Sequence, residues 1–173
     1  MTEVRPDNRI VLMDNERVKR ALRRMCFEII EQNREFSDLL IIGLNKRGHK
    51  LAEMINRNLL QLECETGGLH NIDIHFDPDD HINKLPDTEN ANIIIVDDVL
   101  FSGKTMLKAL EYVLKAGEPS KIQVAVLVDR GHRNFPVEAT FTGLHHPTKL
   151  REHVQVEFGK NDESVEVLMF PRY

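Results

Sequence analysis

The chain has 173 residues, of which 41% are hydrophobic and 29% charged, and its formal net charge is −5. This length suits one domain that buries roughly 70% of the surface of its unfolded chain, and this composition excludes a disordered or fibrous protein. The net negative charge argues against bulk binding to nucleic acid.

The hydrophobic stretches are short. The runs Leu39–Ile42 and Ile93–Val96 fall far below the ~20 residues needed to span a bilayer. The segment Met1–Pro6 lacks the apolar stretch of a signal peptide, and Cys26 and Cys64 have no metal-binding or disulfide-framework spacing. We therefore expect a single cytoplasmic domain over residues 1–173, without membrane association.

Hydrophobic residues recur with the periods of helices and strands. In segment 14–35, Val18, Leu22 and Met25 are spaced by three or four residues, which predicts a helix that Asp14 caps. In chain order, we predict strand 10–13, helix 14–35, strand 39–42, helix 47–62, strand 72–76, strand 92–96, helix 104–115, strand 122–128, strand 137–141, and a hairpin of strands 154–158 and 165–170.

The order of these elements indicates the fold class. Strands that alternate with helices predict an α/β fold with a mainly parallel central sheet flanked by helices, to which the hairpin adds antiparallel C-terminal strands. Ligands of such folds bind outside the carboxyl ends of the strands. Candidate site residues are therefore sought at those ends.

The first such end is the segment Gly43–Gly48. Its two glycines let backbone N–H groups approach an anion, and the following helix N-terminus adds partial positive charge. Lys46 and Arg47 add full charges, and an arginine can bind phosphate through two hydrogen bonds. A tight strand–helix turn with surface bases would explain the same residues equally well. This segment alone therefore does not distinguish an anion-binding site from an ordinary turn.

The segment after strand 92–96 is more informative. Asp97 and Asp98 are adjacent carboxylates directly after a buried apolar strand, where repulsion and burial both penalise them. Such a pair is explained if it accepts hydrogen bonds from a ligand's hydroxyl groups or helps to hold a cation. Ser102–Thr105 then opens a helix with hydroxyl side chains and a glycine, the composition of a phosphate-binding turn.

Two other interpretations of this segment are less favoured. A P-loop has the pattern Gly-x-x-x-x-Gly-Lys-Ser/Thr, and counting back from Gly103 places Asp98 where the first glycine belongs. A carboxylate there would point at the phosphate groups, which argues against an NTPase. A plain strand–turn–helix connection gives no reason for two adjacent acids.

Together these residues resemble the phosphoribosyl-diphosphate motif of type I phosphoribosyltransferases. Segment 122–133 and the later Pro147-Thr148 closely resemble the bifunctional pyrimidine operon attenuation regulator / uracil phosphoribosyltransferase family. Arg20–Leu22 and Gly43–Gly48 are also similar, so the resemblance covers nearly the whole chain, and Val128–Arg133 is its most specific part. It implies the type I phosphoribosyltransferase fold, with a small hood beside the parallel sheet.

The resemblance also implies an activity, the transfer of a phosphoribosyl group from phosphoribosyl diphosphate to uracil, which forms UMP. Asp97 and Asp98 would hold the ribose hydroxyls and Lys46 and Arg47 the pyrophosphate, with Asp97, Asp98 and Arg47 as the catalytic set. Further substrate-binding residues are Val99 and Leu100, followed by the 5′-phosphate site of Phe101, Ser102, Gly103, Lys104 and Thr105.

Base site, cofactor and assembly follow from the same resemblance. Arg130 and His146 would lie near the base. Mg²⁺ is the expected cofactor, carried mainly by phosphoribosyl diphosphate, with no metal ligand assigned to the protein. Family members associate through helices, so we expect a homodimer or homotetramer.

The chain departs from the family pattern at three places, and the first two predict weakened activity. The chain has Asp77–Asp80 where family members carry Tyr-Arg-Asp-Asp, so an arginine expected at the pyrophosphate is missing. The segment from there to Asn92 is shorter than the family's lid, which closes over the substrate. These two departures would lower the rate roughly 10²–10³-fold. The third lies in the base loop, where His146 and Lys149 replace a small apolar residue and a serine, which leaves the choice of base open.

Alternating polar residues suggest one further site. Asp73, His75, Asp77 and Asp79 would share one face of a continued strand and could hold a metal. Pro78 interrupts such a strand, and exposed loop acids are the commoner explanation.

A function of another class is a nucleotide-responsive RNA-binding regulator of pyrimidine biosynthesis genes. The basic helix with Arg17, Arg20 and Arg24 and the segment His132-Arg133 support it, together with the dual role of the family. The net negative charge stands against it, as does Phe27, where such regulators tend to carry a polar histidine. A solvated helix face explains the arginines as well. RNA therefore ranks as the second partner, after phosphoribosyl diphosphate.

Overall fold

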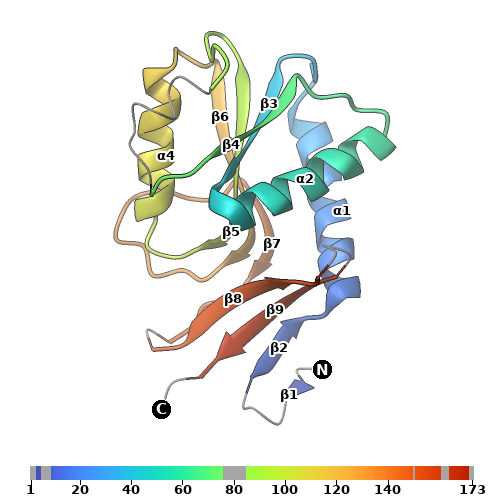
Figure 1. Ribbon diagram of the computed structural model, residues 1–173, viewed down its shortest axis with the longest axis vertical. Coiled ribbons are helices and arrows are strands. Elements are labelled where there is room, and N and C mark those ends of the chain that lie inside the picture. Colours follow the sequence, from blue (N-terminus) through green and yellow to red (C-terminus); the bar gives the residue numbers. More distant parts are fainter. Residues whose placement is uncertain (1–2, 5–8, 76–84, 150, 161–163, 172–173) are drawn as a thin grey trace.

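The computed structural model describes residues 3–4, 9–75, 85–149, 151–160 and 164–171. Its elements are β1 (Glu3–Val4), β2 (Ile10–Met13), α1 (Asn15–Gln32), β3 (Leu39–Leu44), α2 (Asn45–Gln61), β4 (Gly68–Ile72), β5 (Asn92–Leu100), α4 (Lys104–Lys115), β6 (Lys121–Asp129), β7 (Phe141–His145), β8 (His153–Phe158) and β9 (Val165–Phe170). A parallel sheet has the order β4-β3-β5-β6-β7, and an antiparallel sheet of order β1-β2-β9-β8 lies at one end (Figure 1). The predicted α/β architecture is confirmed.

Helices cover both faces of the parallel sheet. α1 and α2 lie on one face and α4 on the other (Figure 1). Ile94 and Val96 of the central strand β5 pack with α1 and α2, whereas Ile93 and Ile95 pack with α4. All four side chains are fully buried, which explains why β5 reads as a continuous apolar run instead of an alternating one. None of the helices in the described part of the chain is long and apolar enough to cross a membrane.

The antiparallel sheet is the small hood that the resemblance implies, and it joins distant parts of the chain. β8 and β9 form the predicted hairpin, closed by a hydrogen bond from the N–H of Gly159 to the carbonyl of Ser164 at 2.8 Å. β9 also pairs with β2. Next to that pairing, the side-chain oxygen of Asn15 accepts a hydrogen bond from the N–H of Val165, 150 positions away.

Two predicted strands were wrong in position. The strand predicted at 72–76 is β4 at 68–72, which pairs in parallel with Leu40–Leu44 of β3. Pairing with the sheet here overrides the low strand preference of the glycine, histidine and asparagine in β4. The strand predicted at 137–141 is β7 at 141–145, which starts at the fully buried Phe141, while Val137 is buried in the loop before it.

Candidate functional site

The predicted loop Gly43–Gly48 is instead a direct joint between β3 and α2. Lys46 and Arg47 lie in the first turn of the helix, because β3 continues up to the residue before Asn45. Asn45 makes the turn with a left-handed φ of 52°, and its side-chain oxygen accepts a hydrogen bond from the N–H of Ile74 at 3.1 Å. Lys46 and Arg47 are thus exposed cations at the positive end of a helix, where an anion is favoured.

α2 approaches β5 closely at Gly48. A Cβ atom there would lie 2.6 Å from the carbonyl oxygen of Val96 and 3.2 Å from Oδ1 of Asp97. Only glycine permits this approach, which brings the helix start that carries Lys46 and Arg47 next to the paired acids. The two strand ends that the sequence singled out therefore lie next to each other.

The paired acids belong to β5, which the sequence predicted to end at Val96. Asp97 is 8% exposed, pairs with Val126 of β6, and accepts the backbone N–H of Asp98 on Oδ1 at 2.9 Å. Burial, and next the neighbouring Asp98 carboxylate, raise the pKa of Asp97 well above its usual value. Asp98 is half-buried. Hydroxyl donors or a cation at this pair would relieve the repulsion, as expected of a binding site.

Because burial disfavours its ionised form, Asp97 is expected to destabilise the free protein at neutral pH. The folded chain holds the Asp97 proton more tightly than the unfolded chain, so stability is lost as the pH rises from the usual aspartate range through the raised pKa. Asp97→Asn should therefore raise Tm at pH 8, with a smaller gain at pH 4, in thermal unfolding scans. The control Asp38→Asn, exposed at the opposite end of the sheet, should not raise Tm at pH 8. A lower Tm for Asp97→Asn at pH 8 would contradict this explanation.

The turn between β5 and α4 presents unpaired backbone N–H groups. Gly103 adopts a left-handed φ of 84°, α4 has no side-chain cap, and the N–H of Lys104 reaches Oγ of Ser102 only at 3.4 Å. Within the described part of the chain, the N–H groups of Phe101, Ser102 and Gly103 have no hydrogen-bond acceptor. Together with the half-buried Thr105 at the helix start, these groups suit a phosphate.

The other predicted substrate residues lie around this turn. Val99 and Leu100 belong to β5, and Lys104 is exposed in the first turn of α4. Arg130 is 5% exposed, and its guanidinium carbon lies 4.3 Å from the ring centroid of Phe101. His146 is half-buried in the connection after β7. The structure thus places Arg130 directly against the turn.

Arg130 also ties the turn to the connection before β8. Its Nε donates to Oγ1 of Thr148 at 3.0 Å, and its Nη2 donates to the carbonyl of Glu152. These bonds join the Arg130 guanidinium to other parts of the protein. Near a ligand, Arg130 would therefore act through its positive charge and through the Phe101 ring that it stacks against.

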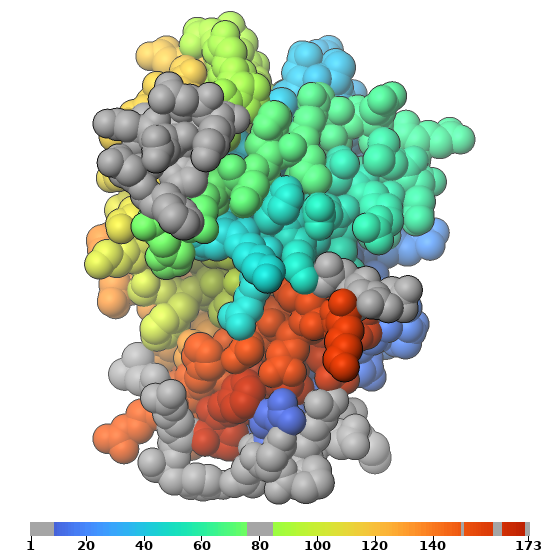
Figure 2. Space-filling model, in the orientation of Figure 1, coloured from blue at the N-terminus to red at the C-terminus, as the bar shows by residue number. Residues whose placement is uncertain are grey.

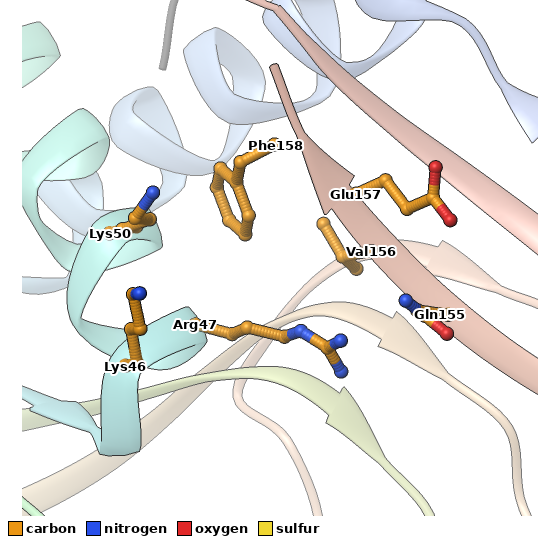
Figure 3. Close-up of a pocket in the computed structure, with 7 residues that line it drawn as sticks. All are labelled: Lys46, Arg47, Lys50, Gln155, Val156, Glu157 and Phe158. Carbon is orange, nitrogen blue, oxygen red and sulfur yellow. The ribbon is translucent and has the colours of Figure 1, made fainter. Parts of the chain in front are cut away.

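A cavity of about 360 Å³ lies between α2 and β8 (Figure 3). Figure 2 shows the start of α2 against the atoms of β8. Arg47 extends from α2 toward β8, and Nζ of Lys50 lies 5.3 Å from the ring centroid of Phe158 (Figure 3). The cavity is lined by Lys46, Arg47, Lys50, Gln155, Val156, Glu157 and Phe158.

Sequence reasoning missed the contribution of Lys50, Gln155 and Phe158 to this cavity. Lys50 follows Lys46 by four residues, so both lie on one helix face, and that spacing was a usable signal. The β8 residues offered no such sequence signal, because the alternation of a strand does not predict which other element the strand will face.

The metal ligands available at the site are the two acids Asp97 and Asp98 at the end of β5. Among the described residues, no three His, Cys, Asp or Glu side chains are placed to hold a metal. Asp97 and Asp98 offer two carboxylates, which suits Mg²⁺ bound mostly by phosphate oxygens and water. Residues 77–80, with two members of the alternative metal site and the departure from the Tyr-Arg-Asp-Asp pattern, lie outside the described residues.

Two arginines of the basic helix α1 bond within the protein. Arg17 donates to the carbonyl of Leu12 at 2.8 Å. Arg24 donates to the carbonyls of Thr142 and Gly143, at 2.8 and 2.9 Å, along the edge strand β7. All three arginines, Arg17, Arg20 and Arg24, are exposed on α1.

Comparison with known proteins relates both the sequence and the fold to characterised families. The profile of the phosphoribosyl transferase domain matches residues 11–159. The bifunctional protein PyrR of Latilactobacillus sakei is 39% identical over 165 residues, which cover 88% of this chain and 92% of that protein. The bifunctional protein PyrR of Ligilactobacillus salivarius is 40% identical over 158 residues, or 84% and 89% of the two chains.

Solved structures share the fold at low sequence identity. HGPRT-ase from Leishmania tarentolae in complex with GMP has a TM-score of 0.75 and 17% identity, over 97% of this chain and 100% of that one. Hypoxanthine phosphoribosyltransferase from Trypanosoma cruzi in complex with IMP has a TM-score of 0.70 and 15% identity, over 91% and 89%. The arrangement of sheet, helices and hood is therefore common to these proteins.

Proposed function

The chain belongs to the phosphoribosyl transferase domain family and is related to the bifunctional PyrR proteins, and on this premise we propose that it transfers phosphoribosyl from phosphoribosyl diphosphate to uracil. One observation carries the proposal. The close approach at Gly48 places the cationic start of α2 beside the buried acid Asp97, directly before a turn of unpaired N–H groups. A ligand that has a diphosphate, a vicinal diol and a terminal phosphate matches these three features.

Each part of the substrate has a matching group. Asp97 and Asp98 accept hydrogen bonds from the two ribose hydroxyls, which are neutral donors able to approach a carboxylate pair. The N–H groups from Phe101 to Thr105 bind the 5′-phosphate. Lys46 and Arg47 neutralise the diphosphate, which Mg²⁺ further polarises when it is bound with the substrate.

The chemistry requires no covalent nucleophile from the protein. N1 of uracil forms a bond to the anomeric carbon while the bond from this carbon to pyrophosphate breaks, and the N1 proton is lost. Catalysis then consists of positioning the two reactants and stabilising the charge on the leaving group, for which Arg47 is placed at the cavity. The sequence departure at Asp77–Asp80 leads us to propose a slow enzyme.

The identity of the base that accepts the phosphoribosyl group is the most specific part of the proposal. The solved structures that share the fold hold the purine nucleotides GMP and IMP, so hypoxanthine is the discriminating competitor of uracil. The resemblance of Val128–Arg133 to the pyrimidine family supports uracil.

Calorimetry with phosphoribosyl diphosphate and Mg²⁺, followed by product assays with uracil and hypoxanthine, tests this function. We expect binding, and UMP formed in preference to IMP. IMP as the sole product would replace uracil by a purine base. Binding without any product would reduce the function to nucleotide sensing, and the absence of binding would overturn the proposal.

A second candidate, regulation through RNA binding, is supported by the exposed Arg20 on α1 and by the dual role that the related proteins' name states. An RNA ligand would lose affinity by roughly one log unit per log unit of salt for each phosphate contacted. Binding measured between 50 and 200 mM salt, with the variant Arg20→Gln, tests this role separately from catalysis.

A further inference from the structure

Arg133 lies behind the phosphate-binding turn, and the proposed reaction gives it no role. We propose that Arg133 is a positioning residue: it holds the peptide groups of the turn so that their N–H groups face the 5′-phosphate. This inference rests on the proposed function, because it assigns the cause of the turn's affinity for phosphate.

The Arg133 side chain donates hydrogen bonds from all three of its guanidinium nitrogens. It donates to a carboxylate and to four backbone carbonyls that come from three segments of the chain. The acceptors are Oδ1 of Asp129 at 2.5 Å and the carbonyls of Phe101 at 2.6 Å, Val137 at 2.9 Å, Gly131 at 3.0 Å and Leu100 at 3.4 Å. Bonds from Nε, Nη1 and Nη2 thus hold the guanidinium against the backbone of these segments.

The bond to Phe101 fixes the direction of the next N–H group. In a trans peptide unit, the C=O and N–H bonds point in opposite directions. The carbonyl of Phe101 points to Arg133, so the N–H of Ser102 points to the other side of the turn. That N–H has no acceptor in the described part of the chain.

The neighbouring peptide units follow the same rule. The carbonyl of Leu100 accepts the N–H of Arg130 at 2.9 Å, and the carbonyl of Ser102 accepts those of Asn134 and Phe135 at 3.0 and 3.1 Å. The N–H groups of the residues that follow, Phe101 and Gly103, are thereby turned away from segment 130–135. Three successive N–H groups thus point away from segment 130–135, toward the side on which a phosphate would bind.

Segment 129–133 is shaped to bring Arg133 to this place. Gly131 and His132 both have left-handed conformations, with φ of 68° and 57°, and they fold the chain back after β6. The carboxylate of Asp129 accepts the N–H of Gly131 at 2.9 Å as well as the Arg133 guanidinium. A left-handed histidine is uncommon, and the bonds around it compensate for its strain.

The test compares two ligands that use different parts of the site. Calorimetry with Mg²⁺ measures the affinity of ribose 5-phosphate, which needs the turn, and of pyrophosphate, which needs Lys46 and Arg47. Arg133→Gln should weaken ribose 5-phosphate about 10- to 100-fold and leave pyrophosphate within about 2-fold. Arg133→Lys, which keeps the charge and part of the hydrogen bonds, should give an intermediate loss. The matched control Arg57→Gln, on the exposed face of α2, should change neither affinity.

Each other outcome overturns the inference. Unchanged binding of ribose 5-phosphate to Arg133→Gln would remove the positioning role, and an equal loss of both ligands would reduce Arg133 to a general support of the fold. Wild-type protein that binds neither ligand would overturn the proposed function, and this inference with it.

A measurement on the unaltered protein keeps the test valid if the variants do not fold. In amide NMR spectra of the wild type, addition of ribose 5-phosphate should shift the signals of Phe101, Ser102 and Gly103, whereas pyrophosphate should shift those of the α2 start. Unmoved signals from Ser102 and Gly103, with ribose 5-phosphate bound, would contradict the proposed N–H directions.

Discussion

Asp98→Asn is expected to lower kcat/KM for phosphoribosyl diphosphate about 10²-fold, because a carboxylate that accepts from a ribose hydroxyl becomes a neutral amide. A hydrogen bond to a charged group contributes about 1.5–3 kcal/mol, and its loss from a closed site corresponds to one to two orders of magnitude. Asp98 is half-buried beside the buried Asp97, so the change removes the charge and one acceptor oxygen without opening the core. Initial-rate assays at varied phosphoribosyl diphosphate measure the effect.

The same substitution at Asp38 provides the control for Asp98→Asn. Asp38 is exposed at the amino end of β3, away from the carboxyl ends where the site lies. We expect Asp38→Asn to retain the wild-type kcat/KM. A wild-type value for Asp98→Asn would mean that the acid pair does not touch the sugar.

Gly48→Ala is expected to destabilise the fold by about 2 kcal/mol and to weaken pyrophosphate binding. The added methyl group would meet two backbone neighbours, the carbonyl oxygen of Val96 at 2.6 Å and Cα of Asp97 at 3.1 Å, neither of which can rotate away. Such overpacking typically costs about 1–3 kcal/mol, and here it also outweighs the gain of about 1 kcal/mol that alanine brings to a helix. The helix start must move outward, and with it Lys46 and Arg47.

Urea unfolding and pyrophosphate calorimetry measure the two effects of Gly48→Ala. The control is Gly68→Ala, where the new methyl group would meet the ring of His70 at 2.8 Å, a side chain that can turn aside. A stability of Gly48→Ala equal to that of Gly68→Ala would show that α2 accommodates the methyl group without strain.

The central part of the fold could be predicted because local sequence and tertiary position agree there. The run Ile93–Val96 is apolar on both faces, and this pattern is typical of a parallel strand that helices cover on both sides. Asp97 and Asp98 at its end could be predicted as binding residues because a buried apolar strand gives no reason for two adjacent acids. Their placement on β5 itself could not be foreseen, since it depends on pairing of Asp97 with Val126 on β6.

The parts that sequence reasoning missed depend on contacts between distant segments. β4 contains poor strand formers and exists because β3 offers it a free edge. At Asn45 a single left-handed residue joins β3 to α2 without a loop. Asparagine tolerates this conformation, but its presence in a sequence does not predict it. The role of Arg133 is visible only when its acceptors, which lie more than 30 positions back at Leu100 and Phe101, are in place.

The hood has a consequence for the order in which the protein is made. β2 is synthesised early, but its partner β9 emerges from the ribosome only after all five strands of the parallel sheet. Throughout that interval β2 has an unsatisfied edge on the side where β9 will pair, of the kind that attracts foreign strands. The cavity between α2 and β8 also lacks one wall during this time. A nascent chain would therefore be unable to enclose a ligand in that cavity before β8 has folded against α2.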